Sequence, residues 1–382
     1  MEKLKDLLES IGYKFKDLLE NIMAMDYKRG IARLKEKFKK AKYLLKRIFS
    51  MDYKRMIEVA KKVSKKASKF WIFIMVDMIL CGIKYGAGYL DYALFEMYNL
   101  NPEQRATYLT RGKNNDLVLK YNSKEHFDDF DNKVKFNRIF NKYLKREYLS
   151  LKDEDKNTVI NWINDKKVFV AKVVDGTCGK GVIKVDLSEY KDANETYGFL
   201  IDNNYMLIEE LIIQKGELNE LHPKSINDVR IVTVLNDDKV HIIGAFLRIG
   251  NGEFVDNINS GGMFAPIDIE EGLIRYPAAD KDGNVYKKHP LTNVRIVNFK
   301  IPLWQECLQL VDEAARIVPS VRYVGWDIAI TNDGPVFIEA NPFPGHDIYQ
   351  IPVHTPNKIG VMPKFDEAEG IVYDDDEYGD EY

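Results

Sequence analysis

The sequence predicts an α+β protein with a helical first part and a second part made mostly of antiparallel strands. From about residue 166 onward, short apolar runs follow one another and are separated by Gly- and Asn-rich turns. Short connections favour antiparallel pairing, because parallel strands need long crossovers. One amphipathic helix is expected at residues 303–318, directly before a final hairpin.

Length and composition are those of an ordinary globular protein. A chain of 382 residues is expected to form two or three domains, and its net charge of -3 at pH 7 is small. The cysteines, Cys81, Cys178 and Cys307, show no CxxC spacing, which argues against a disulfide framework and a zinc site. Charged residues interrupt every apolar run near the start, so we expect no signal peptide and a cytoplasmic location.

Residues 1–69 are predicted to form a basic, amphipathic helical region. The motif Met-Asp-Tyr-Lys-Arg starts at Met25 and again at Met51, and each copy leads into a Lys-rich run with apolar residues at helical spacing. Lys and Arg exceed Asp and Glu here by about twelve. Two interpretations stay open: an arm that binds an anionic partner or the inner face of a membrane, or a solvated helical bundle. Neither implies a specific nucleic-acid partner.

Residues 70–165 are predicted to form a helical or mixed domain. Its most apolar segment, residues 70–83, contains Asp77 and is too short to span a bilayer, so we expect a buried helix there. A second helix is expected at residues 132–144. At the other end of the chain, residues 366–382 are rich in Asp and Glu and are expected to form a disordered acidic tail.

Two features after residue 166 suggest a phosphate-binding site. Lys172 lies within an apolar strand run, where a lysine must either face solvent or neutralise a negative charge. A Gly-rich stretch follows at residues 176–181, and glycines allow backbone N–H groups to approach phosphate oxygens closely. The stretch leads into a strand and lacks the Gly-Lys-Ser/Thr of a Walker A loop. It is therefore either a lid over a nucleotide or a plain hairpin tip.

Further candidates lie on the next strands. The strand expected at residues 207–212 carries two acids, and such a segment either offers a hydrogen-bonding edge to a purine or simply ends a strand. Asp228 and Arg230 are two apart, so they point to one face of a strand. Arg230 and Arg248 pair with surface acids or contact an anion, and their place between the Gly-rich stretch and the last hairpin favours the anion.

The last hairpin carries three oxygen-bearing side chains. An Asn-Asp-Gly turn separates two apolar runs. If this turn pairs Ile330 with Val336, Asp327 lies directly opposite Glu339, and Asn341 shares the face of Glu339. Hard oxygen ligands of this kind suit Mg²⁺. The alternative is the solvated face of an edge strand.

The order of these features resembles the ATP-grasp superfamily. It runs from a strand lysine and a Gly-rich hairpin through an acidic hinge, Asp-x-Arg, a further Arg and Asn-x₃-Gly-Gly to Asp…Glu-x-Asn. Residues 85–92 and 325–341 are similar, more narrowly, to the sugar-transfer-associated ATP-grasp family, and the resemblance covers about residues 80–355. It implies two α+β lobes that sandwich ATP, a lid lobe at about 166–215 and a metal-site lobe at about 216–365.

The resemblance also implies a role for individual residues. Phosphates would be bound by Lys133 (or Lys135) and Lys172 beneath a lid that contains Gly176, Thr177, Gly179, Lys180 and Gly181. The nucleoside would be held by Glu209, Glu210 and Leu211 at adenine, and by Asp228 or Glu217 at ribose. Two Mg²⁺ ions, or Mn²⁺ in their place, would be held by Asp327, Glu339 and Asn341. The catalytic and substrate-facing residues would be Arg248, Lys172, Arg230, Asn257, Gly261 and Gly262.

The activity implied by the resemblance is that of an ADP-forming ligase. Such an enzyme uses ATP to activate a carboxylate as an acyl phosphate, and an amine or another nucleophile then displaces the phosphate. The expected substrate is a small molecule, a peptide or a cell-surface saccharide. Two alternatives stay open: a kinase that stops at phosphoryl transfer, and a non-catalytic nucleotide-binding scaffold that works through its basic arm.

Overall fold

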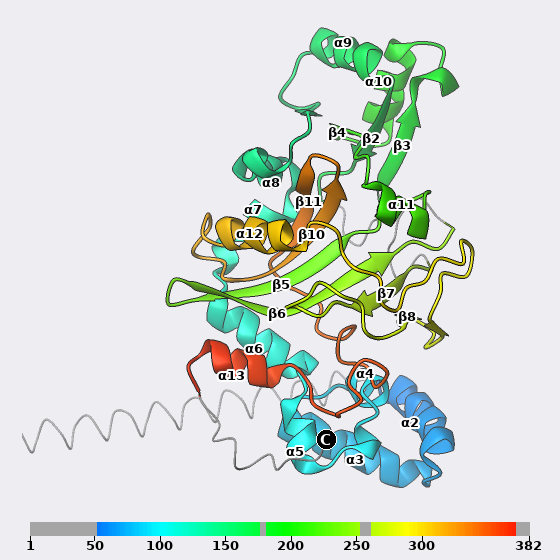
Figure 1. The fold of residues 1–382 in the computed structure, drawn as a ribbon, viewed down its shortest axis with the longest axis vertical. Coiled ribbons are helices and arrows are strands. Elements are labelled where there is room, and N and C mark those ends of the chain that lie inside the picture. The colour runs from blue at the N-terminus through cyan, green and yellow to red at the C-terminus, as the bar shows by residue number, and fades with distance from the viewer. Residues whose placement is uncertain (1–51, 176–180, 253–260, 372–382) are drawn as a thin grey trace, which may run out of the picture. The chain divides into compact units, whose positions relative to one another are not determined.

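The computed structural model describes residues 52–175, 181–252 and 261–371. The chain divides into two compact units, Met1–Ile79 and Leu80–Tyr382 (Figure 1). The first copy of the N-terminal repeat and residues 372–382 of the predicted acidic tail lie outside the described residues. Residues 366–368, predicted as the start of that tail, are the end of the helix α13 (Met362–Ala368). Among the helices that are described, none is long and apolar enough to cross a membrane.

The described part of the first unit contains α2 (Tyr53–Ala67) and the start of α3 (Trp71–Tyr85), which continues into the second unit. α2 begins after Asp52, whose carboxylate accepts a hydrogen bond from the Arg55 N–H at 2.9 Å. The residues that α2 buries, Met56, Ala60 and Val63, follow helical spacing. The basic helix predicted in this part of the chain is therefore observed.

α3 is a helix as predicted, but the expectation that it is buried is wrong for one of its faces. Ile74 and Met78 are buried, whereas Ile72, Phe73 and Val76 on the opposite side are exposed, Phe73 to 70 %. Apolar composition shows how much area a helix can bury, and does not show which faces have a partner.

The second unit begins with several short helices. They are α4 (Tyr89–Leu94), α5 (Pro102–Thr107), α6 (Arg111–Tyr121), α7 (Asp128–Asp131) and α8 (Lys133–Ile139), with 3₁₀ turns at η1 (Met97–Asn99) and η2 (Lys124–His126). The helix predicted at residues 132–144 is thus shorter, and the 3₁₀ turn η3 (Asn141–Tyr143) follows it. Asn132 caps α8 by accepting hydrogen bonds from the Val134 and Lys135 N–H groups, both at 3.1 Å.

A small antiparallel sheet has the order β1-β4-β2-β3. Its strands are β1 (Tyr148–Ser150), β2 (Val168–Lys172), β3 (Val182–Asp186) and β4 (Leu207–Glu210). The helices α9 (Lys156–Lys166) and α10 (Ala193–Asp202) and the 3₁₀ turn η4 (Leu187–Glu189) connect these strands. Side chains from both helices, among them Ile163 and Leu200, share a core with Phe169 and Ile208 of the sheet.

A larger antiparallel sheet has the order β11-β10-β5-β6-β7-β8-β9. Its strands are β5 (Val229–Asn236), β6 (Lys239–Ile249), β7 (Met263–Pro266), β8 (Ala278–Asp280), β9 (Val285–Tyr286), β10 (Tyr323–Thr331) and β11 (Gly334–Asn341). The short helix α11 (Gly216–Leu221) leads from the small sheet into β5. β5 and β6, and β10 and β11, pair through short turns, and β2 pairs antiparallel with β3, which confirms the antiparallel pairing predicted from the sequence.

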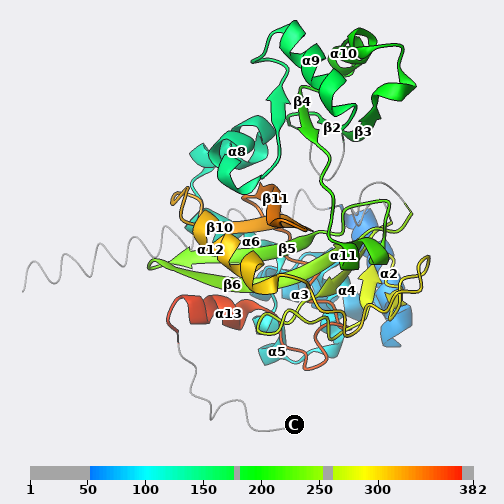
Figure 2. The same ribbon diagram turned by 45° about the horizontal axis from the view of Figure 1, so that its top comes forward.

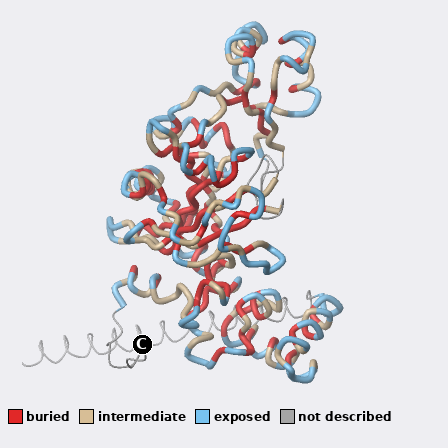
Figure 3. The backbone as a smooth tube through the Cα atoms, turned by 45° about the vertical axis from the view of Figure 1, so that its right-hand side comes forward, coloured by how far each residue is buried: buried red, intermediate tan, exposed pale blue. Residues whose placement is uncertain are grey.

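Helices cover both faces of the larger sheet (Figures 1 and 2). On one face, α12 (Trp304–Ala314) packs Cys307 and Val311 against strand residues that include Trp326. On the other face, α6 and α13 (Met362–Ala368) pack against residues that include Tyr323. Figure 3 shows the buried residues running along these strands. This core fixes the strands whose ends carry the candidate site.

Candidate nucleotide and metal site

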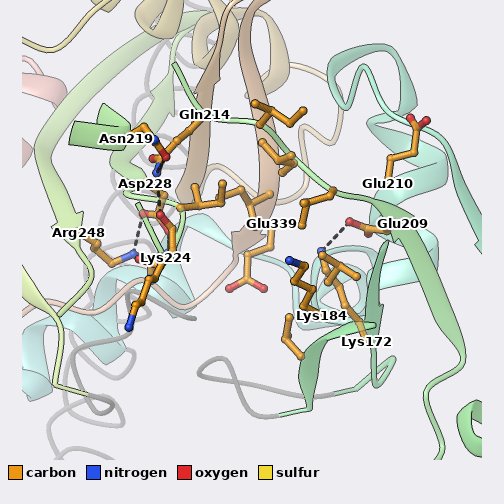
Figure 4. A pocket seen from close by; sticks show the side chains of 18 of the residues that line it. Lys172, Lys184, Glu209, Glu210, Gln214, Asn219, Lys224, Asp228, Arg248 and Glu339 are labelled. Carbon is orange, nitrogen blue, oxygen red and sulfur yellow. Dashed lines mark hydrogen bonds and ion pairs between the residues drawn. The ribbon is translucent and has the colours of Figure 1, made fainter. Parts of the chain in front are cut away.

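A cavity of about 620 Å³ is lined by residues of both sheets and of the segment that joins them (Figure 4). That volume is within the usual range of small-molecule sites. Apolar side chains form part of its wall, and five cationic side chains also face it: Lys133, Lys172, Lys184, Lys224 and Arg248. An apolar wall beside clustered positive charge suits a ligand with a flat ring at one end and phosphates at the other.

One face of the small sheet supplies Lys172 to the cavity. In β2, Val170 and Lys172 are two apart and therefore share a face, and the register pairs them with Lys184 and Val182 of β3. All of these residues line the cavity. The alternate residues of β2, Phe169 and Ala171, belong to the core with α9 and α10. A lysine in an apolar strand is thus explained by a sheet with one face on the core and one face on the cavity.

Lys172 is buried and paired with Glu209. Its Nζ donates a hydrogen bond to Glu209 Oε2 at 2.7 Å, Arg146 Nε donates to the same oxygen at 2.9 Å, and Asn137 Nδ2 donates to Oε1 at 2.8 Å. Burial lowers the pKa of Lys172, and Glu209 opposes this. Burial raises the pKa of Glu209, but the charges of Arg146 and Lys172 outweigh it and lower the pKa to about 2. Glu209 therefore holds Lys172 in position, and its carboxylate has three partners within the chain.

The structure separates the two lysines that were candidates for the first phosphate. Lys133, in the first turn of α8, is buried and lines the cavity. Lys135, two residues further on, is exposed and pairs with Asp128 at 2.5 Å. The geometry therefore favours Lys133.

Asp327 lies at the centre of a buried charge network. It is fully buried on β10, where the register places it beside Arg230 of β5. Arg230 Nη2 donates to Asp327 Oδ2 at 2.6 Å, and Arg248 donates to the same oxygen and, through Nε at 2.7 Å, to Asp228. Burial raises the pKa of Asp327, but the two guanidinium groups outweigh it and hold that pKa below its usual value. Arg230 acts on the site through Asp327 and does not line the cavity.

A β-bulge places Glu339 opposite Asp327. The hairpin pairs Ile330 with Pro335, and not with Val336 as predicted. A regular ladder from that turn would bring Ile338 opposite Asp327, but the register shifts after Ile328 and Asp327 pairs with Glu339. The predicted pairing of Asp327 with Glu339 is therefore confirmed, but the predicted turn register that led to it was wrong.

The Glu339 carboxylate points into the cavity, between the lysines of the small sheet and the Asp228–Arg248 pair (Figure 4). It makes no hydrogen bond or ion pair with any residue in the described part of the chain. An acid without a partner beside several cations fits the ligand set of Mg²⁺ on a phosphate. Asn341 also fits, because its amide oxygen accepts one hydrogen bond, from the Phe343 N–H at 2.8 Å, and has a second lone pair.

Asp327 fits a metal less directly. For Asp327 to bind a metal, Arg248 has to release the Asp327 oxygen to which it donates a hydrogen bond. Within the described residues, no group of three or more His, Cys, Asp or Glu side chains is placed to hold a metal ion. A metal here would therefore depend on oxygen atoms supplied by the ligand.

The remaining predicted residues divide into those that line the cavity, those that do not, and those outside the described residues. Glu217 on α11 faces solvent and pairs with Lys215 at 3.7 Å, whereas its rival Asp228 lines the cavity. Gly181 closes the hairpin between β2 and β3 with a φ of 74°, and Gly261, at 93°, precedes Gly262 and β7. Glu210 and Leu211 do line it. The predicted residues Gly176, Thr177, Gly179, Lys180 and Asn257 lie outside the described residues.

Sequence reasoning missed three basic residues of the site. Lys184 could have been found, because it alternates with apolar residues on the strand that pairs with Lys172. Lys224 lines the cavity from an irregular segment before β5. Arg146 precedes a three-residue strand. No local pattern marks Lys224 or Arg146, because tertiary folding alone brings them to the cavity and to Glu209.

Comparison with known proteins defines the class of this protein. The profile of the family described as sugar-transfer associated ATP-grasp matches residues 112–365. The chain belongs to this family, as its motifs predicted, and its fold is an α+β ATP-grasp fold preceded by a helical region. No curated protein matches the sequence.

Solved structures that match part of this chain include several ligases. The ATP-grasp ligase PsnB, solved with the precursor peptide PsnA2 and AMPPNP, is 16 % identical; 66 % of this chain and 62 % of PsnB are covered, with a TM-score of 0.38. L-amino acid ligase from Bacillus licheniformis is 14 % identical, with 56 % and 41 % covered and a TM-score of 0.35. D-alanine-D-alanine ligase from Coxiella burnetii is 10 % identical, with 64 % and 56 % covered and a TM-score of 0.38. The chain spans less than two thirds of the length of these proteins.

Proposed function

We propose that this protein is an ATP-dependent, ADP-forming ligase that joins a carboxylate to an amine or another nucleophile. The observation that carries the proposal is the cavity, in which Glu339, unpaired among the described residues, faces buried Lys172 and its neighbouring cations. Family membership supports ATP as the nucleotide. The acyl phosphate, the C–N bond and the nature of both substrates are part of the proposal.

In this proposal the nucleoside lies against the segment that joins the two sheets. Leu211, Ile212 and Ile213 provide apolar surface there, and Ile213 is 74 % exposed. A flat base stacked on these side chains would remove that surface from water. Asp228 would hold the ribose hydroxyls, and this choice is supported by its position in the cavity wall, where Glu217 is absent.

Lys133, Lys172 and Lys184 would bind the phosphates. Lys172 is already held by Glu209, so little reorganisation is needed when a phosphate arrives. Glu339 and Asn341, with Asp327 once Arg248 releases it, would hold two Mg²⁺ or Mn²⁺ ions. Such ions supply charge neutralisation and orientation for phosphoryl transfer.

Arg248 would stabilise the charge that develops at the acyl carbon. Its guanidinium lies at the cavity wall, where Nε donates to Asp228 at 2.7 Å, and this contact remains when Arg248 releases Asp327. Arg230 keeps Asp327 in place behind it. A fixed cation beside a developing oxyanion lowers the barrier, because no solvent has to reorganise.

The decisive experiment is a screen for ADP release with pairs of carboxylates and amines, followed by mass spectrometry of the product. A ligase releases ADP only when both partners are present, and the product mass equals the sum of the partners less water. A product that gains only a phosphate would show a kinase. Function that survives Glu339→Ala combined with Asn341→Ala would show a scaffold.

The substrates of the proposed ligase are a small molecule, a peptide or a saccharide. We also propose that it works in the cytoplasm, with the basic residues 1–69 at the inner face of a membrane or on another anionic partner. The excess of lysine in that region supports this location.

A further inference from the structure

The N-terminal unit carries an exposed apolar surface that the basic composition of residues 1–69 did not indicate. Five apolar side chains at the start of α3 and just before it are exposed: Phe70 (58 %), Ile72 (41 %), Phe73 (70 %), Val76 (47 %) and Ile79 (39 %). Together with the exposed basic side chains of α2 they are called the α2–α3 surface below. Ile74 and Met78, on the opposite side of α3, are buried, so the exposed residues form one continuous helix face.

The basic and apolar parts of the α2–α3 surface are linked through the ring of Trp71. Lys61 of α2 lies over the ring of Trp71, with its Nζ 5.6 Å from the ring centroid. Phe70 packs at 6.2 Å from Trp71 and at 6.3 Å from Phe73, as measured between ring centroids. The exposed basic residues of this part of the chain are Lys54, Arg55, Lys61, Lys62, Lys65, Lys66 and Lys69.

This combination indicates the chemistry of the partner. Adjacent exposed apolar side chains on a folded protein mark a surface that is covered in use. The exposed basic side chains favour an anionic partner, which disfavours a second copy of the same basic surface and the Lys-rich residues 1–51. Aromatic rings beside lysines are typical of helices that lie at the boundary between lipid headgroups and acyl chains.

We propose that the α2–α3 surface binds the surface of a membrane that contains anionic lipids. The apolar face of α3 enters the acyl boundary, and the lysines of α2 contact the headgroups. The helix lies along the membrane, because no described helix is long and apolar enough to cross it. This inference is independent of the ligase chemistry, because none of these residues lines the nucleotide cavity.

The test is sedimentation of the full chain with vesicles of phosphatidylcholine mixed with phosphatidylserine, and with vesicles of phosphatidylcholine alone. Binding is expected only to the mixed vesicles, and it should weaken as salt is added. Phe73→Ser should lower the partition coefficient by about tenfold, because an exposed Phe loses its transfer into the apolar boundary. Lys62→Gln combined with Lys66→Gln should lower it by about thirtyfold, at about fivefold for each charge.

Leu119→Ser is the matched control, because Leu119 on α6 is 61 % exposed and lies in the other unit. It should bind vesicles as the wild type does. Equal binding of all variants, or no binding of the wild type, would overturn the proposal. If the wild type self-associates and Phe73→Ser does not, the surface binds a second copy of the chain. If residues 1–51 become sensitive to protease in Phe73→Ser, the surface binds those residues. Either result would also overturn the proposal.

Discussion

The side chains of this site differ most in whether they already have partners. Glu339 is the acid in the cavity without a hydrogen bond or ion pair to the described residues, whereas Asp228, Glu209 and Asp327 each contact a basic side chain. An unpaired acid contributes little to folding and is available to a ligand. A substitution of Glu339 is therefore expected to affect activity without affecting stability, whereas substitution of its paired neighbours affects both.

We expect Glu339→Gln to lower kcat/KM by about 100-fold or more, because the amide removes a charged metal ligand. Its urea unfolding midpoint should stay that of the wild type, because no ion pair is broken. Glu217→Gln is the matched control, since its side chain is 56 % exposed on α11 outside the cavity. Normal ADP release by Glu339→Gln at saturating Mg²⁺ would contradict the assigned role.

For Glu209, in contrast to Glu339, we expect substitution to lower the stability of the fold. Its pKa is about 2 in the folded protein and 4.5 ordinarily, so its stabilising effect is fully present above pH 4.5 and is lost as the pH falls toward 2. This difference corresponds to about 3 kcal/mol. Glu209→Gln should unfold at lower urea than the wild type at pH 7, because Lys172 and Arg146 lose a buried counter-charge.

The difference in urea unfolding midpoint between wild type and Glu209→Gln should decrease as the pH falls from 4.5 toward 2. Urea titrations at pH 7 and near pH 3 measure it, with Glu217→Gln again as the control. A gap that stays constant with pH would mean that the Glu209 carboxylate does not carry this stabilisation.

At the scale of elements, an irregular segment between α11 and β5 shapes one wall of the cavity. Gln214 holds this segment: its Nε2 donates to the Ser225 carbonyl at 2.7 Å, and its Oε1 accepts from the Asn227 N–H at 2.9 Å. His222 Nε2 accepts from the Gly252 N–H at 2.9 Å, so its Nδ1 carries the proton that is donated to Ser225 Oγ at 2.8 Å. The segment passes so close to Gly250 that a Cβ there would strike both His222 and Ser225.

Gly250→Ala should therefore destabilise the protein by about 1–3 kcal/mol and weaken nucleotide binding, because the wall that carries Lys224 and Asp228 has to shift. Gly198→Ala on α10 is the control. A Cβ at Gly198 meets nothing within 4 Å, so this change should be neutral or stabilising by up to about 1 kcal/mol. Urea unfolding and nucleotide titration measure both variants, and equal behaviour of the two would refute the close approach.

Elements with strong local signals were predictable, and elements defined by tertiary contacts were not. The hairpin β10–β11 follows from its turn and alternation, and α12 from its period, although α12 ends at Ala314 and not at 318. The bulge at Ile338 was not predictable, because it reflects packing of the sheet and not turn chemistry. The exposure of Phe73 was not predictable either, since composition does not say which surface lacks a partner.

At the scale of the whole molecule, the cavity wall is shared between the small sheet and the larger one. Lys172 and Lys184 come from the small sheet, whereas Arg248 and Glu339 come from the larger sheet. Among the described residues that line the cavity, five side chains are cationic and four are acidic, so positive charge is in excess. A bound polyphosphate with Mg²⁺ would supply the missing negative charge, and it would join the two sheets.

We therefore expect a non-hydrolysable ATP analogue with Mg²⁺ to slow amide hydrogen exchange in both sheets at once. Protection should rise in β2 and β3 of the small sheet and also at Ile338 and Glu339 of β11 in the larger sheet, because the ligand contacts both walls. In Glu339→Gln the Mg²⁺-dependent part of this protection should disappear, while Glu217→Gln should behave as the wild type. Protection confined to one sheet would mean that the nucleotide does not bridge the cavity, and the roles assigned to the opposite wall would then be wrong.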